Sequence, residues 1–326
     1  MANNDVVVSG IRPTGVPHLG NLRGALQQWV DLQEKYPCFY FIADWHALFG
    51  LEERSREIKE NTKKVLATLL AVGLDPEKST IFIQSQVPEH LTLFTIFSAI
   101  TPVGWLERNP TLKDMVRAEE PLPYGLLGYP VLQAADILLY KGTMVPVGKD
   151  QQPHLEISRE IARRFNSLFG VEFFPEPQAV LNEYPVLPGT DGRKMSKSYS
   201  NVISIEDDHE TVRFKVRQMI TDPQKIRKSD PGHPDICSVF QLEKGFVDSA
   251  YSKDIYDRCV QGLLGCVEHK NMLADIIWQY LEPIREKYFY YLEHEEELWK
   301  IASYGNEKAE KVAKETMREV LDIIGL

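Results

Sequence analysis

The chain has 326 residues, of which 43 % are hydrophobic and 26 % are charged, and its formal net charge is −10. This composition excludes collagen-like, low-complexity and wholly disordered proteins, and four cysteines are too few for a disulfide scaffold. No apolar run approaches the ~18 residues of a membrane-spanning helix, and the N-terminus lacks the basic region of a signal peptide, so we expect a cytoplasmic protein outside the membrane.

The first half of the chain alternates short apolar runs with longer runs of helical periodicity. Strand, helix and strand in this order indicate a parallel sheet with helices on both faces, an α/β fold of the Rossmann-type doubly wound class. Residues 173–192 contain four prolines and are typical of a connector, and beyond about residue 204 the pattern is helical throughout. We predict strands at 6–8, 38–43, 80–83 and 144–148, and helices at about 21–36, 53–72, 131–140 and 152–169.

The turn between the first strand and the first helix, residues 9–21, is rich in glycine and proline. In a doubly wound sheet this is the place where nucleotides bind, because the helix that follows presents free N–H groups to phosphates. His18 and Asn21, three residues apart at the start of that helix, could both donate to a phosphate oxygen. A turn of this kind taken alone is more often a plain connection, and it matches neither the GxGxxG nor the P-loop pattern.

A second motif, residues 189–198, carries two lysines three residues apart among small hydroxyl side chains. Lysines on such a loop suit a triphosphate, because they can stay with the departing pyrophosphate. The string runs from Lys194 to Ser198 (KMSKS) and follows the His-Leu-Gly-Asn turn by ~175 residues. In that order, the two resemble the paired ATP motifs of the class I aminoacyl-tRNA synthetases.

A third block narrows the resemblance. The strings 128–140 and 145–156, together with 43–47 and 73–78, are similar to those of bacterial tryptophanyl-tRNA synthetases. The resemblance implies an enzyme that activates L-tryptophan with ATP and Mg²⁺ and transfers it to tRNA(Trp), acting as a homodimer. It also implies a Rossmann-type catalytic domain at 1–203, with a helical dimer-interface insertion at about 100–145 and an ATP loop at 189–200. A helical anticodon-recognition domain is expected at 204–326, with a terminal helix at about 306–326.

Asp136 is the residue on which substrate choice is expected to depend. An indole offers one N–H group and a large apolar surface, so its pocket needs one buried acceptor and apolar walls. Asp136 lies inside an otherwise apolar helical run, where a carboxylate without a partner is costly. The resemblance assigns the indole N–H to Asp136 and the ammonium and carboxylate ends to Tyr129 and Gln151. The full tryptophan-binding set implied is Val8, Gly10, His46, Tyr129, Gln133, Asp136 and Gln151.

The same resemblance implies the ATP site. Lys113 and Asp150 are expected near the junction between ATP and the amino acid. The catalytic set implied is Lys194, Lys197, His18, Asn21 and Lys113, and the ATP-binding set is Arg12, Thr14, His18, Gly20, Asn21, Gly148, Asp150, Lys194, Met195, Ser196 and Lys197.

Three residues depart from the family pattern. Gln133 stands where many members have Met, which adds a hydrogen-bonding group to the pocket, and Lys149 stands where Glu is usual. Arg12 replaces a frequent Gln and is a candidate contact for ATP phosphates or a carboxylate. None of the three removes a motif residue needed for activation.

Cys237, Cys259, Cys266 and His269 form a candidate metal site, in which the last three read C-x6-C-x2-H. Soft ligands at such spacing suit Zn²⁺ or an iron–sulfur cluster. Some tryptophanyl-tRNA synthetases carry a four-cysteine [4Fe-4S] site in this region, and here His269 takes the fourth position. Three interpretations stay open: a site with a His ligand, an incomplete cluster, or buried helix cysteines without metal.

Six basic residues and one acidic residue lie between Arg213 and Lys228. This basic stretch predicts either an RNA-facing surface or a solvated helix face.

Two rival functions stay open. The tyrosyl enzymes share the fold and the ATP loops, so they are the nearer rival, although the block 148–156 favours tryptophan. A paralogue that binds tryptophan and nucleotide without charging tRNA is the rival from another class, and the two loop lysines argue against it.

Overall fold

The computed structural model describes residues 5–49, 52–108, 123–148, 151–181 and 186–326. A five-stranded parallel sheet forms its centre, in the order β3-β2-β1-β4-β5. The strands β1, β2 and β3 are rich in β-branched and aromatic residues, and most of their positions are buried, as expected for strands covered on both faces. The doubly wound α/β fold predicted from the sequence is confirmed. The strands are β1 (Val7–Ile11), β2 (Cys38–Ile42), β3 (Ser79–Ile83), β4 (Met144–Val147) and β5 (Gln178–Leu181).

Strand order reverses between β1 and β4, which places the crevice at the carboxyl end of β1. β5 is a correction to the sequence analysis, which assigned the whole of 173–192 to a connector. The strand has four residues and pairs with β4 alone, at the edge of the sheet. A short edge strand needs one partner and tolerates prolines around it, so its sequence carries little strand signal.

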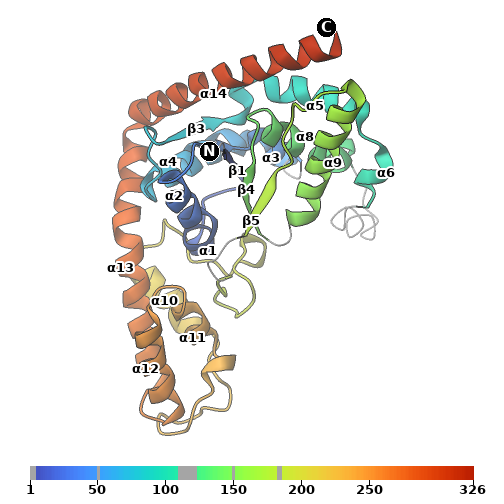
Figure 1. Cartoon of the computed structure of the whole chain (residues 1–326). Helices are drawn as coiled ribbons and strands as arrows, with labels where there is room; N and C mark the ends of the chain where they lie inside the picture. Colours follow the sequence, from blue (N-terminus) through green and yellow to red (C-terminus); the bar gives the residue numbers. More distant parts are fainter. Residues whose placement is uncertain (1–4, 50–51, 109–122, 149–150, 182–185) are drawn as a thin grey trace.

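The helices cover both faces of the sheet (Figure 1). The first predicted helix is divided, because a π-helical turn at Leu22–Leu26 separates α1 from α2, and short 3₁₀ turns occupy Glu52–Glu57, Gln84–Gln86, Lys197–Tyr199 and Pro234–Ile236. The helices of the first half are α1 (Leu19–Asn21), α2 (Gln27–Gln33), α3 (Asp44–Leu48), α4 (Ile58–Ala71), α5 (Glu89–Ile100), α6 (Val103–Leu106), α8 (Tyr124–Leu138) and α9 (Gln152–Phe169). The remaining helices are α10 (His209–Gln218), α11 (Ser238–Glu243), α12 (Ser249–Val260), α13 (Cys266–Glu293) and α14 (Glu295–Ile324).

The last two helices return to the sheet. In Figure 1, α13 rises from the group of α10, α11 and α12 and leads into α14, which runs along the edge beside β3. Gly305 makes this approach possible, since a Cβ there would lie 1.7 Å from the carbonyl oxygen of Ile81. Asn306 Oδ1 accepts a hydrogen bond of 2.9 Å from the backbone N–H of Ile83. The edge of β3 is therefore covered by the end of the chain.

The hydrophobic core continues across the predicted boundary at residue 203. One cluster joins Leu22 and Leu66 of the α/β half to Leu281 of α13 and Ala302 of α14. The division into 1–203 and 204–326 stays a prediction, and these contacts show α13 and α14 packed on the first half. Within the described ranges, no helix is long and apolar enough to cross a membrane.

Candidate active site

The turn after β1 leads directly into α1 and places His18 at its start. Asn21 Oδ1 accepts a 3.1 Å hydrogen bond from the backbone N–H of His18, so the two predicted phosphate ligands hold each other in place. The His18 ring is buried, and its Nδ1 has no hydrogen-bond partner among the described residues. Burial, followed by the charges of Lys197 and Lys194, lowers the pKa of His18 to about 4. The ring is therefore neutral at pH 7 and donates through one nitrogen only.

Asn201, which the sequence analysis did not single out, organises the KMSKS loop. Its Oδ1 accepts from the backbone N–H of Ser196 at 2.7 Å. Its Nδ2 donates to Asp191 Oδ1 at 2.7 Å and to the carbonyl of Lys194 at 3.1 Å. The Asn201 side chain is 2 % exposed, and it packs so closely on Gly189 that a Cβ there would lie 2.4 Å from its Cγ. One buried amide thus links both sides of the loop.

The two predicted ATP motifs lie against each other. The backbone N–H of Leu19 donates to the carbonyl of Ile203 at 2.8 Å, which joins the start of α1 to the segment after the loop. Met195 is buried, and its Cβ lies 3.5 Å from a Cβ placed on Gly20. The ammonium of Lys197 lies beside Gly15, 3.3 Å from a Cβ placed there, and the partial burial of this ammonium lowers the pKa of Lys197 to about 8.

Several other predicted ATP ligands are exposed or lie outside the described residues. Arg12, Thr14, Lys194 and Gly148 are exposed at the surface of this region. The predictions for Lys113 and Asp150, and the departure at Lys149, fall outside the described residues.

Asp136 of α8 is the centre of a buried polar network, and its side chain is 1 % exposed. His46 Nε2 lies 2.7 Å from Asp136 Oδ2. His90 Nδ1 lies 2.6 Å and Gln84 Nε2 2.7 Å from Asp136 Oδ1. Burial alone would raise the pKa of Asp136, but attraction and hydrogen bonding by His46, with help from His90, lower it to about 2. The carboxylate is therefore charged and acts as an acceptor only.

The donors around Asp136 come from the carboxyl ends of neighbouring strands. His46 lies in α3, directly after β2, and Gln84 directly follows β3. Parallel strands end at one edge of the sheet, so residues far apart in the chain meet there. The sequence analysis included His46 but missed Gln84 and His90, since single polar residues carry no spacing signal.

Tyr129, Gln133 and Asp136 lie on one side of α8, since they follow the i, i+4, i+7 spacing. Gln133 is half-buried. The hydroxyl of Tyr129 lies 2.7 Å from Nε2 of His154, and Nδ1 of His154 lies 2.9 Å from Oε1 of Gln151. His154, 3 % exposed in α9, therefore joins the two residues assigned to the amino acid's ends, and the sequence analysis did not single it out.

Val8 and Gly10 sit in β1, close to the network. Val8 is fully buried, and a Cβ placed on Gly142 would lie 2.7 Å from its Cγ2. Gly10 is exposed on one side and packs against the Phe41 ring on the other, where a Cβ would lie 2.5 Å from Cε2 of the ring. The close approach of this ring therefore requires a glycine at position 10.

The structure does not support the candidate metal site. Within the described part of the chain, no three His, Cys, Asp or Glu side chains form a group that could hold a metal ion. His269 Nε2 lies 3.0 Å from Oε1 of the buried Glu243. Burial raises the pKa of Cys237 and of Cys259. Nothing below depends on a metal at this place.

Some of the six residues of the basic stretch are engaged by the chain itself. Lys225 is buried and its ammonium donates to the carbonyl groups of Lys228 and Asp230, so it cannot face RNA. Lys215 pairs with Asp207 at 2.6 Å. Of the six basic residues, Arg227 is among those exposed.

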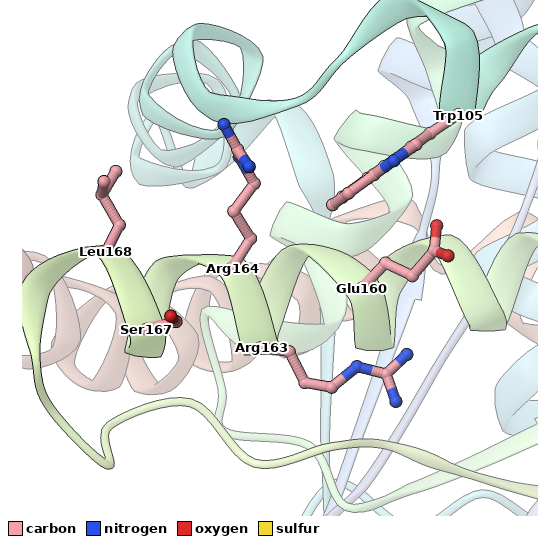
Figure 2. Close-up of a pocket in the computed structure, with 6 residues that line it drawn as sticks. All are labelled: Trp105, Glu160, Arg163, Arg164, Ser167 and Leu168. Carbon is pink, nitrogen blue, oxygen red and sulfur yellow. The ribbon is translucent and has the colours of Figure 1, made fainter.

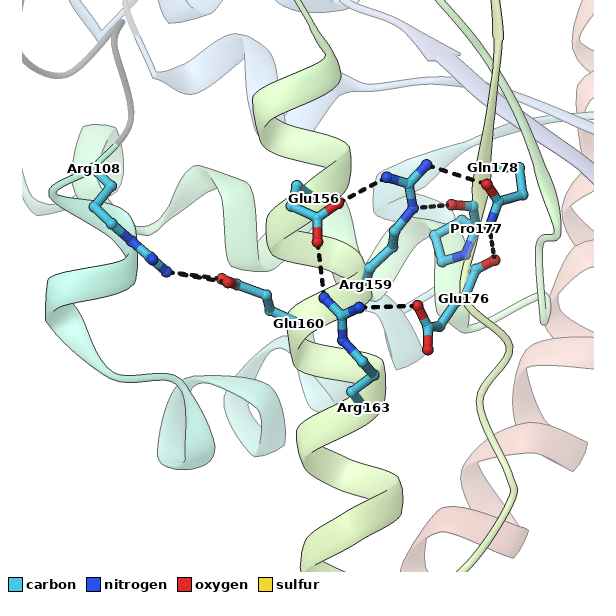
Figure 3. A network of polar contacts seen from close by, with 8 residues as sticks. All are labelled: Arg108, Glu156, Arg159, Glu160, Arg163, Glu176, Pro177 and Gln178. Carbon is cyan, nitrogen blue, oxygen red and sulfur yellow. Dashed lines mark hydrogen bonds and ion pairs between the residues drawn. The ribbon is translucent and has the colours of Figure 1, made fainter.

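The outer face of α9 carries a hollow of about 410 Å³ beside Trp105 (Figure 2). Its charged side chains already have partners, as Figure 3 shows for Glu160 with Arg108 and for Arg163 with Glu156 and Glu176. Arg164, also in the lining, donates to the backbone carbonyl of Ile100, and its guanidinium lies 5.8 Å from the centre of the Trp105 ring.

Comparison with known proteins places this geometry in a family. Residues 2–282 match the model of the tRNA synthetases class I (W and Y). The chain is 43 % identical to the tryptophan–tRNA ligase of Aquifex aeolicus, covering 98 % of this chain and 99 % of that one. It is 46 % identical to that of Thermotoga maritima, covering 96 % and 97 %. The crystal structure of the Campylobacter jejuni tryptophanyl-tRNA synthetase complexed with ADP and tryptophan has a TM-score of 0.89 at 40 % identity, covering 98 % and 100 %. The chain therefore belongs to the class I tRNA synthetases of the tryptophan and tyrosine group and, within that group, to the tryptophan–tRNA ligases.

Proposed function

We propose that the enzyme activates L-tryptophan and charges tRNA(Trp) with the residues described above. The tryptophan carboxylate attacks the α-phosphorus of Mg-ATP, the bond to the β-phosphate oxygen breaks, and pyrophosphate leaves. A hydroxyl of the terminal ribose of tRNA then attacks the carbonyl carbon of tryptophanyl-AMP, and AMP leaves. The observation that carries this proposal is the contact between the two ATP motifs, which puts Lys197 beside Gly15 at the carboxyl end of β1.

The phosphate end of the site gathers His18, Lys194 and Lys197. Besides burial, the positive charges of Lys197 and Lys194 lower the pKa of His18, which supports placing all three groups around one anion. A triphosphate would neutralise these charges, and the lysines would stabilise the charge that grows on the leaving pyrophosphate. His18 and Asn21 at the start of α1 would donate to the phosphate oxygens. No protein group forms a covalent bond in this scheme, so catalysis is by positioning and charge stabilisation.

The tryptophan end follows from hydrogen-bond direction. With Nδ1–H of His154 donating to Gln151 Oε1, the Gln151 amide nitrogen is a donor suited to the substrate carboxylate. Nε2 of His154 then accepts from Tyr129, and the phenol oxygen is an acceptor suited to the ammonium. Asp136 accepts the indole N–H. The crystal structure of the Campylobacter jejuni relative, complexed with ADP and tryptophan, supports binding of both kinds of ligand.

The broader assignments follow the family. We infer a cytoplasmic homodimer, with the helices beyond residue 204 reading the anticodon and Mg²⁺ arriving with ATP. Exposed apolar side chains at Val103 and Tyr124, both within the expected dimer-interface insertion, support the dimer.

The test is ATP–pyrophosphate exchange with tryptophan and with tyrosine. We expect exchange with tryptophan only, and we expect Asp136→Asn to lower kcat/KM for tryptophan by about 100-fold, because a charged acceptor is lost. Asp275→Asn, which changes a half-exposed carboxylate of α13 outside the site, is the control. Exchange with tyrosine but not tryptophan would overturn the substrate assignment.

A further inference from the structure

His90 of α5 is a buried histidine that the proposed reaction does not use. Its ring is 0 % exposed, and both nitrogens are engaged. Nδ1 lies 2.6 Å from Asp136 Oδ1, and Nε2 lies 2.8 Å from the hydroxyl of Tyr140. The rings of Phe41 and Phe82 pack around it, each with a centroid 5.9 Å away. The imidazole is therefore held in one orientation by contacts on every side described.

The direction of the hydrogen bond between His90 and Asp136 follows from the carboxylate. An ionised carboxylate accepts and cannot donate, so Nδ1 of His90 carries the hydrogen. Nε2, on the other side of the ring, is hydrogen-bonded to the Tyr140 hydroxyl. Tyr140, His90 and Asp136 thus form a buried chain of hydrogen-bonded side chains.

This chain distinguishes the two oxygens of Asp136. His90 and Gln84 both bind Oδ1, on the buried side of the carboxylate. Among the described residues, the hydrogen-bond partner of Oδ2 is His46, whose side chain is 11 % exposed. Oδ2 consequently faces the least buried of the side chains that bind Asp136 and carries one of their three hydrogen bonds.

We propose that His90 is a positioning residue for tryptophan selection, which holds Asp136 by Oδ1 so that Oδ2 meets the indole N–H. The inference rests on the proposed contact between Asp136 and the indole, and it goes beyond that contact by naming the group that orients the acceptor. An acceptor held in one orientation binds a correctly placed N–H group well. A ligand that lacks this N–H group binds poorly, because the acceptor loses its partner. His90 therefore contributes to the choice of amino acid without touching it.

The experiment compares tryptophan with 3-benzothienylalanine, which replaces the indole N–H by sulfur at nearly the same shape. The readout is the ratio of kcat/KM for the two amino acids in ATP–pyrophosphate exchange. The wild type should favour tryptophan by about 10³-fold or more. His90→Asn places an amide nitrogen near the position of Nδ1 and keeps the donor to Asp136. His90→Gln places its amide near Nε2 and keeps only the contact with Tyr140.

We expect His90→Gln to lower the tryptophan preference by about 10- to 100-fold, because one hydrogen bond to a charged group is lost. His90→Asn and the control Tyr140→Phe should keep the preference within about threefold of the wild type, since both retain a donor to Asp136. Thermal unfolding of each variant reports on folding separately.

The outcomes separate the two proposals. A wild type that does not prefer tryptophan over 3-benzothienylalanine overturns the contact between Asp136 and the indole, and the role of His90 with it. If the wild type prefers tryptophan and the His90→Gln variant keeps that preference, the role of His90 is overturned, whereas the contact between Asp136 and the indole stands. Equal losses for both amino acids in His90→Asn and His90→Gln would mean that His90 only packs the core, which also overturns it.

Discussion

The two ends of the site are built in opposite ways. At the tryptophan end, Asp136 is buried and accepts hydrogen bonds from His46, Gln84 and His90, and His46 and His90 lower its pKa to about 2. At the ATP end, His18 has a buried nitrogen without a partner among the described residues, and Lys197 has a pKa lowered to about 8. The acceptor at the first end is oriented by protein donors, whereas the second end gathers basic groups.

This difference matches what each end must do. Choosing one amino acid requires an acceptor of fixed position, because selectivity depends on pairing buried polar groups. Reaction of a triphosphate requires cations that bind the phosphates of ATP and then stabilise the charge on the leaving pyrophosphate. These cations must therefore not be neutralised by protein carboxylates. The predictions below test whether the ATP end can be damaged while the tryptophan end stays intact.

Replacing Lys194 and Lys197 together by Ala should have the largest effect. We expect ATP–pyrophosphate exchange to fall by about 10³-fold or more, since two groups that stabilise the leaving charge are lost. Tryptophan binding, measured by calorimetry, should be unchanged because Asp136 and its donors are untouched. Lys253→Ala, an exposed lysine of α12, is the control. Unchanged exchange in the double variant would remove the lysines from the mechanism.

Replacing Asn201 by Ala should have an intermediate effect. The change deprives the Ser196 N–H and the Asp191 carboxylate of a buried partner, so the free energy of unfolding should fall by about 1–3 kcal/mol. The KM for ATP should rise about tenfold as the loop loses its shape, while the KM for tryptophan stays the same. Chemical denaturation and exchange kinetics provide both measurements. An equal rise in the two KM values would contradict the separation of the two ends.

The smallest expected effect is a dependence of ATP binding on pH. With a pKa of about 8, Lys197 is about nine-tenths protonated at pH 7 and about one-tenth at pH 9. Loss of the proton weakens attraction for phosphate, so the KM for ATP should rise about threefold as the pH increases from 7 to 9. His18, with a pKa of about 4, stays neutral between pH 7 and 9, so it does not contribute to the change in the KM for ATP.

Lys197→Arg tests the origin of that rise, because arginine keeps its charge throughout the range. Its KM for ATP should be flat between pH 7 and 9, whatever its absolute value. A profile as steep as that of the wild type would assign the titration to another group.

The sequence predicted the residues whose neighbours in the chain form a motif. The turn containing His18 and the KMSKS loop were recognised by their resemblance to the paired ATP motifs of the class I synthetases, and Asp136 was conspicuous as a charge within an apolar run. His90 and Asn201 could not be predicted, since each is a single polar residue in an ordinary segment. Their importance comes from partners 46 and 5 residues away, respectively, which only folding brings within hydrogen-bond distance.

The sequence by itself determined the doubly wound class, the approximate positions of four strands and the two candidate ATP motifs. These depend on local periodicity and on short strings, which are properties of neighbouring residues. Only the tertiary structure decided the order of the strands in the sheet, that β5 forms at its edge, that α14 covers β3, and that His269 pairs with Glu243. Each of these depends on a partner distant in sequence, and hydrogen bonding and packing select such partners only in the folded chain.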